Sequence, residues 1–426
     1  MYPHEILSLY NLYKLWTNQW RSSSELKQIQ EEKLRRLIHH AYRSVPYYRK
    51  LMDSAGVKPQ DIQGTSGLKL IPTTSKKTLL ALPKEEIVSE DFKNERLVTI
   101  QSSGSTGCPF SVLFTRQDSR LTWFSFLRAF TANGLNLWDK TLIYTGSFRI
   151  PSKKPWFEHL GILRRYYVAI EAEADARVEG ILRFNPSVIQ GTWGVLLALA
   201  KEVTGRSIKD IRTKLIFGYG DTIASSERKF IGDILGGRIV DIYGSGEAGI
   251  IAWECGHCPG YHINIDMVII EFLKDGQDVS PGTAGEIVLT NLHSYAMPLI
   301  RYEQQDMGIR SDKKPLCGRG LPLMKSFEGR TDDFVILPTG KAVPPSFFIA
   351  VFTPLKDIFQ WRVVQESAHK IKVLIVSSKV SSEKIRNIEN ALKEKLGAEV
   401  EITIELVDEI KKDPSGKRRA VVSKVK

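Results

Sequence analysis

The sequence predicts an α/β fold: a large amino-terminal domain of parallel and mixed sheets with helices, and a small α+β carboxy-terminal domain. Two changes of pattern along the 426 residues predict it. From about residue 85 to 250, short β-branched runs alternate with helical windows, as in βαβ units with a mostly parallel sheet. Beyond residue 335 the order becomes strand, strand, helix, strand, which is typical of a compact α+β unit. We therefore expect domains of 1–330 and 331–426.

The individual elements follow from local periodicity. Leu34, Leu37, Ile38 and Ala41 recur at helical spacing and Pro46 ends the pattern, which indicates an amphipathic helix. In the first domain we expect strands at 96–100, 141–144, 187–191, 214–220 and 238–244, and helices at 193–205 and 225–235. In the second we expect strands at 359–366, 369–378 and 399–407, a helix at 382–397, and a basic tail at 408–426.

Charge and hydropathy exclude several classes of protein. Lys and Arg number 60 against 48 Asp and Glu, a net charge of +12 that is mild for this length. No zinc-finger spacing with a short gap and no RNP-type aromatic signature accompanies the basic residues, so we expect no nucleic-acid partner. Polar residues interrupt the amino terminus too often for a signal-peptide core. The longest apolar run, 193–200, falls far short of the roughly 20 residues of a spanning helix, so we expect a soluble, cytoplasmic protein without a membrane span.

A Ser/Thr/Gly loop follows the first expected strand. The stretch "SSGSTGCP" at 102–109 offers backbone N–H groups and hydroxyls to an anion, and its glycines allow phosphate oxygens to come close. A Walker loop requires lysine after its last glycine, whereas Cys108 and Pro109 follow Gly107 here. By itself the loop is either a phosphate site or an ordinary polar turn.

This loop resembles the T-S-G-T-T-G-x-P signature of the adenylate-forming superfamily, which includes acyl-coenzyme A synthetases, peptide-synthetase adenylation domains and firefly luciferase. Four further signatures of that superfamily follow in its order: "DIYGSGEAG" at 241–249, "PLIRYEQQDMG" at 298–308, "FEGRTDDFVILPTGKAV" at 327–343 and "KDPSGKRRAVVSKV" at 412–425. Within the superfamily, "KLRRLIHHAYRSVPYYRKLM" at 33–52 and "LIPTTSK" at 70–76 are similar to the phenylacetate–coenzyme A ligase family, in particular to its branch from capsular-polysaccharide gene clusters.

The resemblance implies a two-step ligase. ATP would activate a small-molecule carboxylic acid as an acyl-adenylate with release of pyrophosphate, and the acyl group would pass to coenzyme A with release of AMP. Three alternatives stay open. The acceptor is an amine or hydroxyl of a sugar or carrier in polysaccharide biosynthesis, or the chain is a non-catalytic nucleotide-binding relative, or it is a basic scaffold held by zinc, which explains none of the five signatures. The family often forms homodimers.

The resemblance also assigns the nucleotide-binding residues. The β- and γ-phosphates would be held by Ser102, Ser103, Gly104, Ser105, Thr106 and Gly107. The adenine would lie between Tyr243, with its neighbour Gly244, and the loop that ends at Asp221. Asp306 would accept hydrogen bonds from both ribose hydroxyls, although Gln304 and Gln305 stand where many members have threonine and glycine.

The resemblance assigns roles in charge compensation and domain movement to four further residues. Glu247 would bind Mg²⁺, a hard cation that prefers carboxylate and phosphate oxygens, and Arg330 would contact the ribose or phosphate. Lys417, in a mobile carboxy-terminal lid, would neutralise the charge that develops on the α-phosphate. Asp332 would be the hinge about which this lid rotates between the two steps. Ordinary structural roles are the alternatives: an exposed glutamate, a core tyrosine, surface ion pairs and a solvated basic run.

A separate constellation involves cysteine and histidine. Cys255 and Cys258 have C-x-x-C spacing, with His257 and His262 beside them, and Cys317 lies 59 residues after Cys258. Two such thiolates can bind one tetrahedral Zn²⁺ at about 2.3 Å each, and Cys317 with a histidine would complete a closed structural site. We favour His262, because the adjacent His257 and Cys258 point differently in an extended segment. Free thiols are the alternative.

Overall fold

The computed structural model describes residues 3–101, 110–208, 211–220, 222–330, 333–343, 345–352, 355, 358–377, 381–410 and 419–425. The chain forms two compact units. One comprises Met1–Gly134 and Ile242–Phe327, and the other Leu135–Asp241 and Glu328–Lys426. The change of unit after Phe327 lies close to the predicted boundary at 330/331, but the two-domain division itself stays a prediction. No helix in the described ranges has the length and apolarity needed to cross a bilayer.

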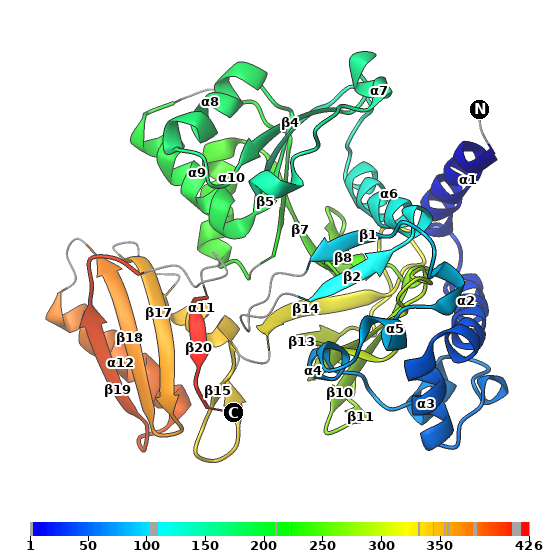
Figure 1. The fold of residues 1–426 in the computed structure, drawn as a ribbon. Coiled ribbons are helices and arrows are strands. Elements are labelled where there is room, and N and C mark those ends of the chain that lie inside the picture. The colour runs from blue at the N-terminus through cyan, green and yellow to red at the C-terminus, as the bar shows by residue number, and fades with distance from the viewer. Residues whose placement is uncertain are drawn as a thin grey trace. The chain divides into compact units, whose positions relative to one another are not determined.

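Helices dominate the start of the first unit (Figure 1). They are α1 (Pro3–Asn18), α2 (Ser23–Ser44), α3 (Pro46–Ser54), α4 (Lys76–Leu80), α5 (Lys84–Ile87) and α6 (Arg116–Ala132), with short 3₁₀ turns at Pro59–Asp61, Thr65–Leu70 and Glu90–Phe92. The predicted amphipathic helix is confirmed as α2. It begins with a capping box between Ser22 and Glu25, and Pro46 opens α3 at a position where its missing N–H costs nothing.

The apolar stripe of α2 forms one core of this unit. Leu34, Leu37 and Ile38 are fully buried and pack with residues far along the chain, among them Ile269 and Ile300. Burying each such side chain stabilises the fold by about 1.5–3 kcal/mol relative to leaving it in water. The amino-terminal helices are therefore anchored by strands that come more than half a chain later.

The first unit also contains an extensive antiparallel region. Its strands are β8 (Gly249–Cys255), β9 (Cys258–Ile263), β10 (Val268–Lys274), β11 (Gln277–Asp278), β12 (Ala284–Asn291), β13 (Tyr302–Arg310) and β14 (Leu323–Arg330), which follow β7 (Arg238–Ser245). Neighbouring strands run in the order β11-β10-β12-β13-β14-β9-β8-β7, and β1 (Val98–Gln101) pairs separately with β2 (Ser111–Phe114). The predicted mixed character of the sheets is confirmed.

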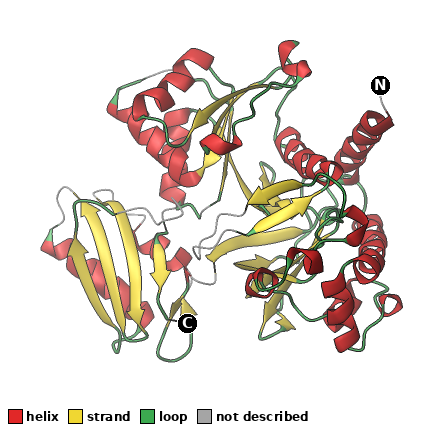
Figure 2. Ribbon diagram, viewed as in Figure 1, coloured by secondary structure: helices red, strands yellow, loops and turns green. Residues whose placement is uncertain are grey.

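The middle of the chain forms the parallel part, in the second unit (Figure 2). Strands β3 (Lys140–Thr145), β4 (Arg164–Ala169), β5 (Val188–Thr192) and β6 (Leu215–Tyr219) pair in parallel, in the order β6-β5-β3-β4. The helices here are α7 (Trp156–His159), α8 (Ala174–Phe184), α9 (Trp193–Gly205) and α10 (Ser225–Leu235), with a 3₁₀ turn at Ser147–Arg149. The predicted alternation of strands and helices is confirmed.

The carboxy-terminal segment has the predicted α+β pattern. It contains β15 (Val335–Ile336), β16 (Ala342–Val343), α11 (Pro345–Phe352), β17 (Ile358–Ser367), β18 (Lys370–Ser377), α12 (Ser382–Leu396), β19 (Glu401–Leu406) and β20 (Val421–Ser423). The four-stranded sheet has the order β19-β18-β17-β20. Strand β20 lies within the basic tail at 408–426, where Val421 is buried and pairs in parallel with Val363 of β17.

Candidate nucleotide site and cysteine–histidine cluster

Several predicted site residues lie outside the described part of the chain. They are Ser102, Ser103, Gly104, Ser105, Thr106, Gly107, Asp221, Asp332 and Lys417. On either side of the predicted phosphate loop, β1 and β2 pair in antiparallel register, with Gln101 opposite Ser111. The loop therefore joins two strand ends that are held together.

Two of the predicted residues, Tyr243 and Asp306, contact each other directly. The Tyr243 hydroxyl, on β7, donates a hydrogen bond to Oδ2 of Asp306, on β13, over 2.9 Å. Both side chains are buried, and the Tyr243 ring stacks on Phe327 with 4.8 Å between centroids. The structure thus brings together one aromatic and one acidic member of two separate signatures.

A bulge in β13 precedes Asp306. Glu286 of β12 pairs with Met307, but Val288 pairs with Glu303, so that residues 304–306 face a single residue of the neighbouring strand. Gln305 takes a left-handed conformation with φ of 59°. Bulges bend a strand and change the direction of the next side chain. The two glutamines that depart from the family pattern therefore form the irregular segment that sets the direction of Asp306.

Glu247 lies in the turn between β7 and β8 and is also buried. Its main-chain oxygen accepts a hydrogen bond of 2.8 Å from Nδ2 of Asn291, and Oδ1 of Asn291 accepts one of 3.1 Å from the backbone N–H of His293. Burial lowers the pKa of His293 to about 4, so this ring is neutral, and Nε2 of that ring lies 3.3 Å from Oγ1 of Thr122. Asn291 thus links the turn of Glu247 to a buried polar network.

Sequence reasoning missed Asn291 and His293. The signal that could have found them is the run "EIVLTNLHS" at 286–294, where polar side chains suddenly follow a buried apolar strand. Gly244, which was predicted, has a steric explanation: a β-carbon there would lie 2.5 Å from the carbonyl oxygen of Gly249. Arg330 is the last residue of β14 and belongs to the second unit.

An ion pair flanks the predicted hinge and the predicted tail lysine. Nε of Arg419 donates to Oδ1 of Asp333 over 2.6 Å, and the carbonyl oxygen of Arg419 accepts a hydrogen bond from Arg362 of β17. Asp333 follows Asp332 directly, and Arg419 comes two residues after Lys417. The described neighbours of both predicted residues are therefore tied to each other.

The cysteine–histidine residues gather into one cluster in the first unit. Cys255 ends β8 and Cys258 begins β9, opposite each other across a two-residue turn. The ligand atoms of Cys255, Cys258, His262 and Cys317 all lie within 4.8 Å of one another. The gap of 59 residues is closed because β9 pairs with β14, with His262 opposite Leu323. His257 is exposed in the turn and is not among the clustered residues.

The surroundings of the cluster suit a tetrahedral metal with one nitrogen and three sulfur ligands. Nε2 of His262 lies 3.2 Å from Sγ of Cys255 and 3.4 Å from Sγ of Cys317, while Nδ1 faces the Leu321 carbonyl oxygen at 3.4 Å. Burial lowers the pKa of His262 to about 4, which keeps the ring neutral as a metal ligand requires, and raises the pKa of the Cys255 thiol to about 11. Without a cation, thiolates at this spacing would lack their charge partner.

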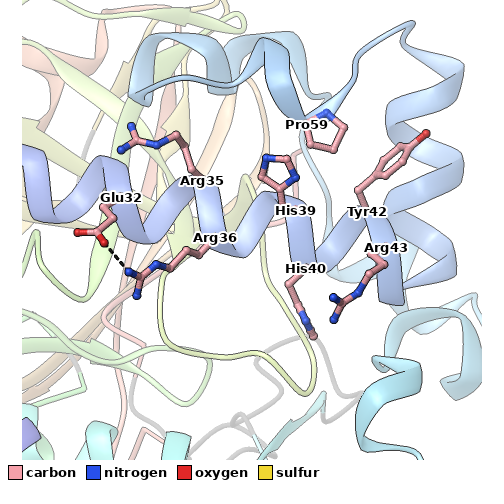
Figure 3. A pocket seen from close by; sticks show the side chains of 8 residues that line it. All are labelled: Glu32, Arg35, Arg36, His39, His40, Tyr42, Arg43 and Pro59. Carbon is pink, nitrogen blue, oxygen red and sulfur yellow. Dashed lines mark hydrogen bonds and ion pairs between the residues drawn. The ribbon is translucent and has the colours of Figure 1, made fainter.

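The first unit also has a surface pocket (Figure 3). It lies along α2 and is lined by Glu32, Arg35, Arg36, His39, His40, Tyr42, Arg43 and Pro59. Its cations already have partners: Arg36 pairs with Glu32, and Arg43 pairs with Asp91. None of the predicted site residues within the described ranges lines it, so we assign it no part in the candidate nucleotide site.

Comparison with known proteins identifies the family. The phenylacetate–coenzyme A ligase of Pseudomonas putida is 30% identical over 353 residues, covering 74% of this chain and 73% of the relative. The one from Thermus thermophilus is 29% identical over 357 residues, covering 78% and 76%. Residues 335–424 match the CapK C-terminal domain, and Protein CapK of Staphylococcus aureus is 19% identical over 419 residues, covering 95% and 91%.

Solved structures agree on the fold. A 2-hydroxyisobutyryl-CoA ligase in the postadenylation state matches with a TM-score of 0.80 at 18% identity, covering 96% of this chain and 91% of that chain. The anthranilate CoA ligase AuaEII in complex with anthranoyl-AMP matches with a TM-score of 0.60 at 18% identity, covering 76% and 65%. From the sequence relatives and the matching domain, this chain belongs to the phenylacetate–coenzyme A ligase family, in its CapK-like branch.

Proposed function

We propose that this chain is an AMP-forming acid–thiol ligase that activates a carboxylic acid with ATP and transfers the acyl group to coenzyme A. The observation that carries the proposal is the hydrogen bond from Tyr243 to Asp306. This contact joins a buried aromatic ring and a carboxylate, the two side chains to which the family resemblance assigns the adenine and the ribose. The ligase relatives supply the reaction class.

The first step joins the acid to AMP. A carboxylate oxygen of the acid attacks the α-phosphorus, and pyrophosphate leaves on the opposite side. Negative charge on both sides must be offset, which we assign to Lys417 and to the hydroxyls and amides of residues 102–107. Mg²⁺, bound by Glu247 through the hard oxygen ligands that it prefers, would supply further compensation of phosphate charge.

Asp306 has the chemistry that ribose binding requires. A carboxylate can accept hydrogen bonds from two hydroxyls at once, and the Tyr243 hydroxyl fixes the direction of this one by occupying a lone pair of Oδ2. Tyr243 with Gly244, together with the loop at Asp221, would enclose the adenine. Arg330 would contact the ribose or phosphate from the end of β14.

The second step requires the residues near the carboxy terminus to change their role. The thiol sulfur of coenzyme A attacks the acyl carbonyl carbon, and AMP leaves with its phosphate oxygen. We propose that residues 331–426 act as the lid, that Asp332 is its hinge, and that the Asp333–Arg419 ion pair holds the end of the segment that carries Lys417. The other 330 residues would form the large domain.

We further propose a structural Zn²⁺ bound by Cys255, Cys258, Cys317 and His262. The support is the mutual distance of their ligand atoms, and the backbone N–H of Leu316 that donates to Sγ of Cys258 over 3.1 Å. Such hydrogen bonds to ligating sulfur are typical of second-layer contacts at metal sites. Three sulfurs and one nitrogen leave no open position for substrate, so the metal would stabilise the fold.

A second candidate function changes only the acceptor. The match of residues 335–424 to the CapK C-terminal domain favours it, because this is the segment to which we assign the acceptor step. In that case the acyl group passes from AMP to an amine or hydroxyl of a sugar or carrier in polysaccharide biosynthesis. The site residues for activation are the same in both cases. A cytoplasmic location and a homodimer complete the proposal.

The deciding experiment is carboxylate-dependent ATP–pyrophosphate exchange over aryl, fatty, hydroxy and amino acids, with Lys417→Ala as the control. We expect exchange with at least one class of acid, and loss of exchange in the variant while transfer from a supplied acyl-adenylate survives. Product analysis with coenzyme A, amines and sugars then identifies the acceptor. Equal loss of both steps would contradict the role of Lys417. Silence with every acid, despite ATP binding, would favour a non-catalytic relative.

A further inference from the structure

The second unit carries a surface where large apolar side chains lie exposed. Leu137, Trp138, Trp156 and Leu160 expose 56%, 65%, 73% and 62% of their area. Two segments of the chain contribute to this surface and lie close together. A β-carbon added to Gly161, the residue that follows Leu160, would lie 4.0 Å from the ring of Trp138. We call these four residues, with the exposed Lys153, Lys154 and Arg164, the Trp156 surface.

The backbone below this surface is firmly held. Arg165 at the start of β4 donates to Glu158 of α7, from Nε to Oε1 over 2.7 Å and from the backbone N–H to Oε2 over 3.3 Å. The guanidinium of Arg165 also lies over the Phe157 ring, 5.9 Å from its centroid, and the carbonyl oxygen of Phe157 accepts from the N–H of Ile162. Trp156 and Leu160 are therefore presented by an ordered turn whose inward residues are satisfied.

The charge of the surface is of one sign. Between residues 137 and 170 the sequence contains two acidic residues, Asp139 and Glu158. Asp139 forms an ion pair with Lys214, and the Glu158 carboxylate is buried against Arg165. Lys153, Lys154 and Arg164 are exposed beside the aromatic side chains. The surface thus combines exposed cations with exposed tryptophan.

We propose that the Trp156 surface docks the protein on the anionic headgroup layer of a lipid bilayer. The tryptophan ring is amphipathic and favours the boundary between headgroups and acyl chains, and basic side chains near an anionic bilayer are attracted to its surface. A second copy of the chain fits less well, because a two-fold contact through this surface would bring its cations against one another. Docking of this kind is peripheral and needs no spanning helix.

The test is co-sedimentation of the full chain with vesicles of phosphatidylcholine, with and without phosphatidylglycerol. We expect the wild type to bind the anionic vesicles at least tenfold more tightly than the neutral ones, with affinity falling as salt is raised. Two double variants should each lose this binding by tenfold or more: Trp156→Ser with Leu160→Ser, and Lys153→Glu with Lys154→Glu. The exposed side chains make both variants compatible with folding, which circular dichroism checks.

A matched control separates this surface from net charge. Lys84→Glu with Lys93→Glu makes the same change of charge at exposed positions of the first unit and should leave vesicle binding unchanged. Equal binding to neutral and anionic vesicles, or equal loss in the control, would overturn the proposal. So would vesicle binding that survives both test variants, or a change of oligomeric state in the Trp156 variant without vesicle binding by the wild type. ATP–pyrophosphate exchange in solution is independent of this outcome, so failure of the docking proposal and failure of the ligase proposal are distinguishable.

Discussion

The hydroxyl of Tyr243 donates a hydrogen bond of 2.9 Å to Oδ2 of Asp306, across 63 positions of sequence. Each residue stands in its own signature, and the fold brings them together from β7 and the bulged β13, although β14, β9 and β8 lie between these strands in the sheet order. The contact gives the carboxylate a fixed direction before any nucleotide binds. Preorganised acceptors of this kind cost less to bring into contact with a ligand.

Replacing Tyr243 by Phe should weaken ATP binding. The change removes the hydrogen bond to Asp306 and keeps the ring that stacks on Phe327. Because a hydrogen bond to a charged group contributes about 1.5–3 kcal/mol, we expect the KM for ATP in pyrophosphate exchange to rise about tenfold or more. Tyr144→Phe, which removes a hydroxyl bonded to the Arg177 carbonyl oxygen, is the control and should leave this KM unchanged. An unaltered KM in Tyr243→Phe would show that Asp306 is positioned without it.

Asn291→Ala should raise the Mg²⁺ concentration needed for half-maximal exchange. The side chain holds the main-chain oxygen of Glu247 and accepts from the N–H of His293, so its loss frees the turn that carries the predicted Mg²⁺ ligand. Two buried backbone groups also lose partners, at about 1–3 kcal/mol each, so the melting temperature should fall as well. A positioning role predicts that added Mg²⁺ restores much of the rate. An equal loss of rate at every Mg²⁺ concentration would indicate a purely structural role.

Purified protein should contain about one zinc per chain, and Cys317→Ser should lose most of it. Removing one of four ligands opens the site, and the remaining thiols then bind metal less tightly. Chelation should lower the melting temperature of the wild type more than that of the variant. Cys108→Ser is the matched control, since this cysteine stands apart in sequence from the cluster. Less than half an equivalent of zinc in the wild type would contradict the site.

The stability of the wild type should fall between pH 6.5 and pH 4, in part through His293. Burial lowers the pKa of this ring to about 4, whereas the unfolded chain has the ordinary value near 6.5. Within this window the unfolded state binds a proton that the folded state refuses, so the free energy of unfolding falls as pH falls, by about 2 kcal/mol between pH 7 and pH 5.

His293→Gln tests this effect by urea unfolding at both pH values. The variant should have a lower free energy of unfolding at both pH values, because a buried ring is replaced. Between pH 7 and pH 5, however, its free energy of unfolding should fall less than that of the wild type, by roughly the 2 kcal/mol that we assign to protonation of His293. Parallel decreases in both proteins would mean that His293 titrates normally in the folded state.

Most of the fold that could be predicted from the sequence followed from local patterns of apolar and β-branched residues. Helix α2 and helix α10 follow from the spacing of their apolar residues, and the parallel strands of the second unit follow from short β-branched runs. Such signals depend on neighbours in sequence. The antiparallel strands from β8 to β14 were not foreseen individually, because their pairing depends on partners that only the folded chain supplies.

The candidate site residues also include some contacts that local sequence predicts and others that only the folded chain brings about. Cys255 and Cys258 are two residues apart, so their proximity is visible in the sequence, whereas Cys317 reaches them only through the pairing of β9 with β14. The bulge before Asp306 depends on the register between β12 and β13. The run at 286–294 marks Asn291 as a polar residue after an apolar strand, but it does not show that Asn291 contacts the main-chain oxygen of Glu247. Contacts that depend on strand register, or on main-chain atoms, can be identified only from the folded structure.

The burial of the α2 stripe against Ile269, Leu292 and Ile300 has a consequence for biosynthesis. A ribosome adds about 5–20 residues per second, so on the order of 10–50 s pass between the emergence of α2 and that of its partners. During this interval the stripe of Leu34, Leu37 and Ile38 can be covered only by the nearby members of its cluster, among them Met52 and Ile62. The nascent chain is therefore exposed to aggregation through its first helices, and a chain truncated before Ile269 would keep that exposure permanently.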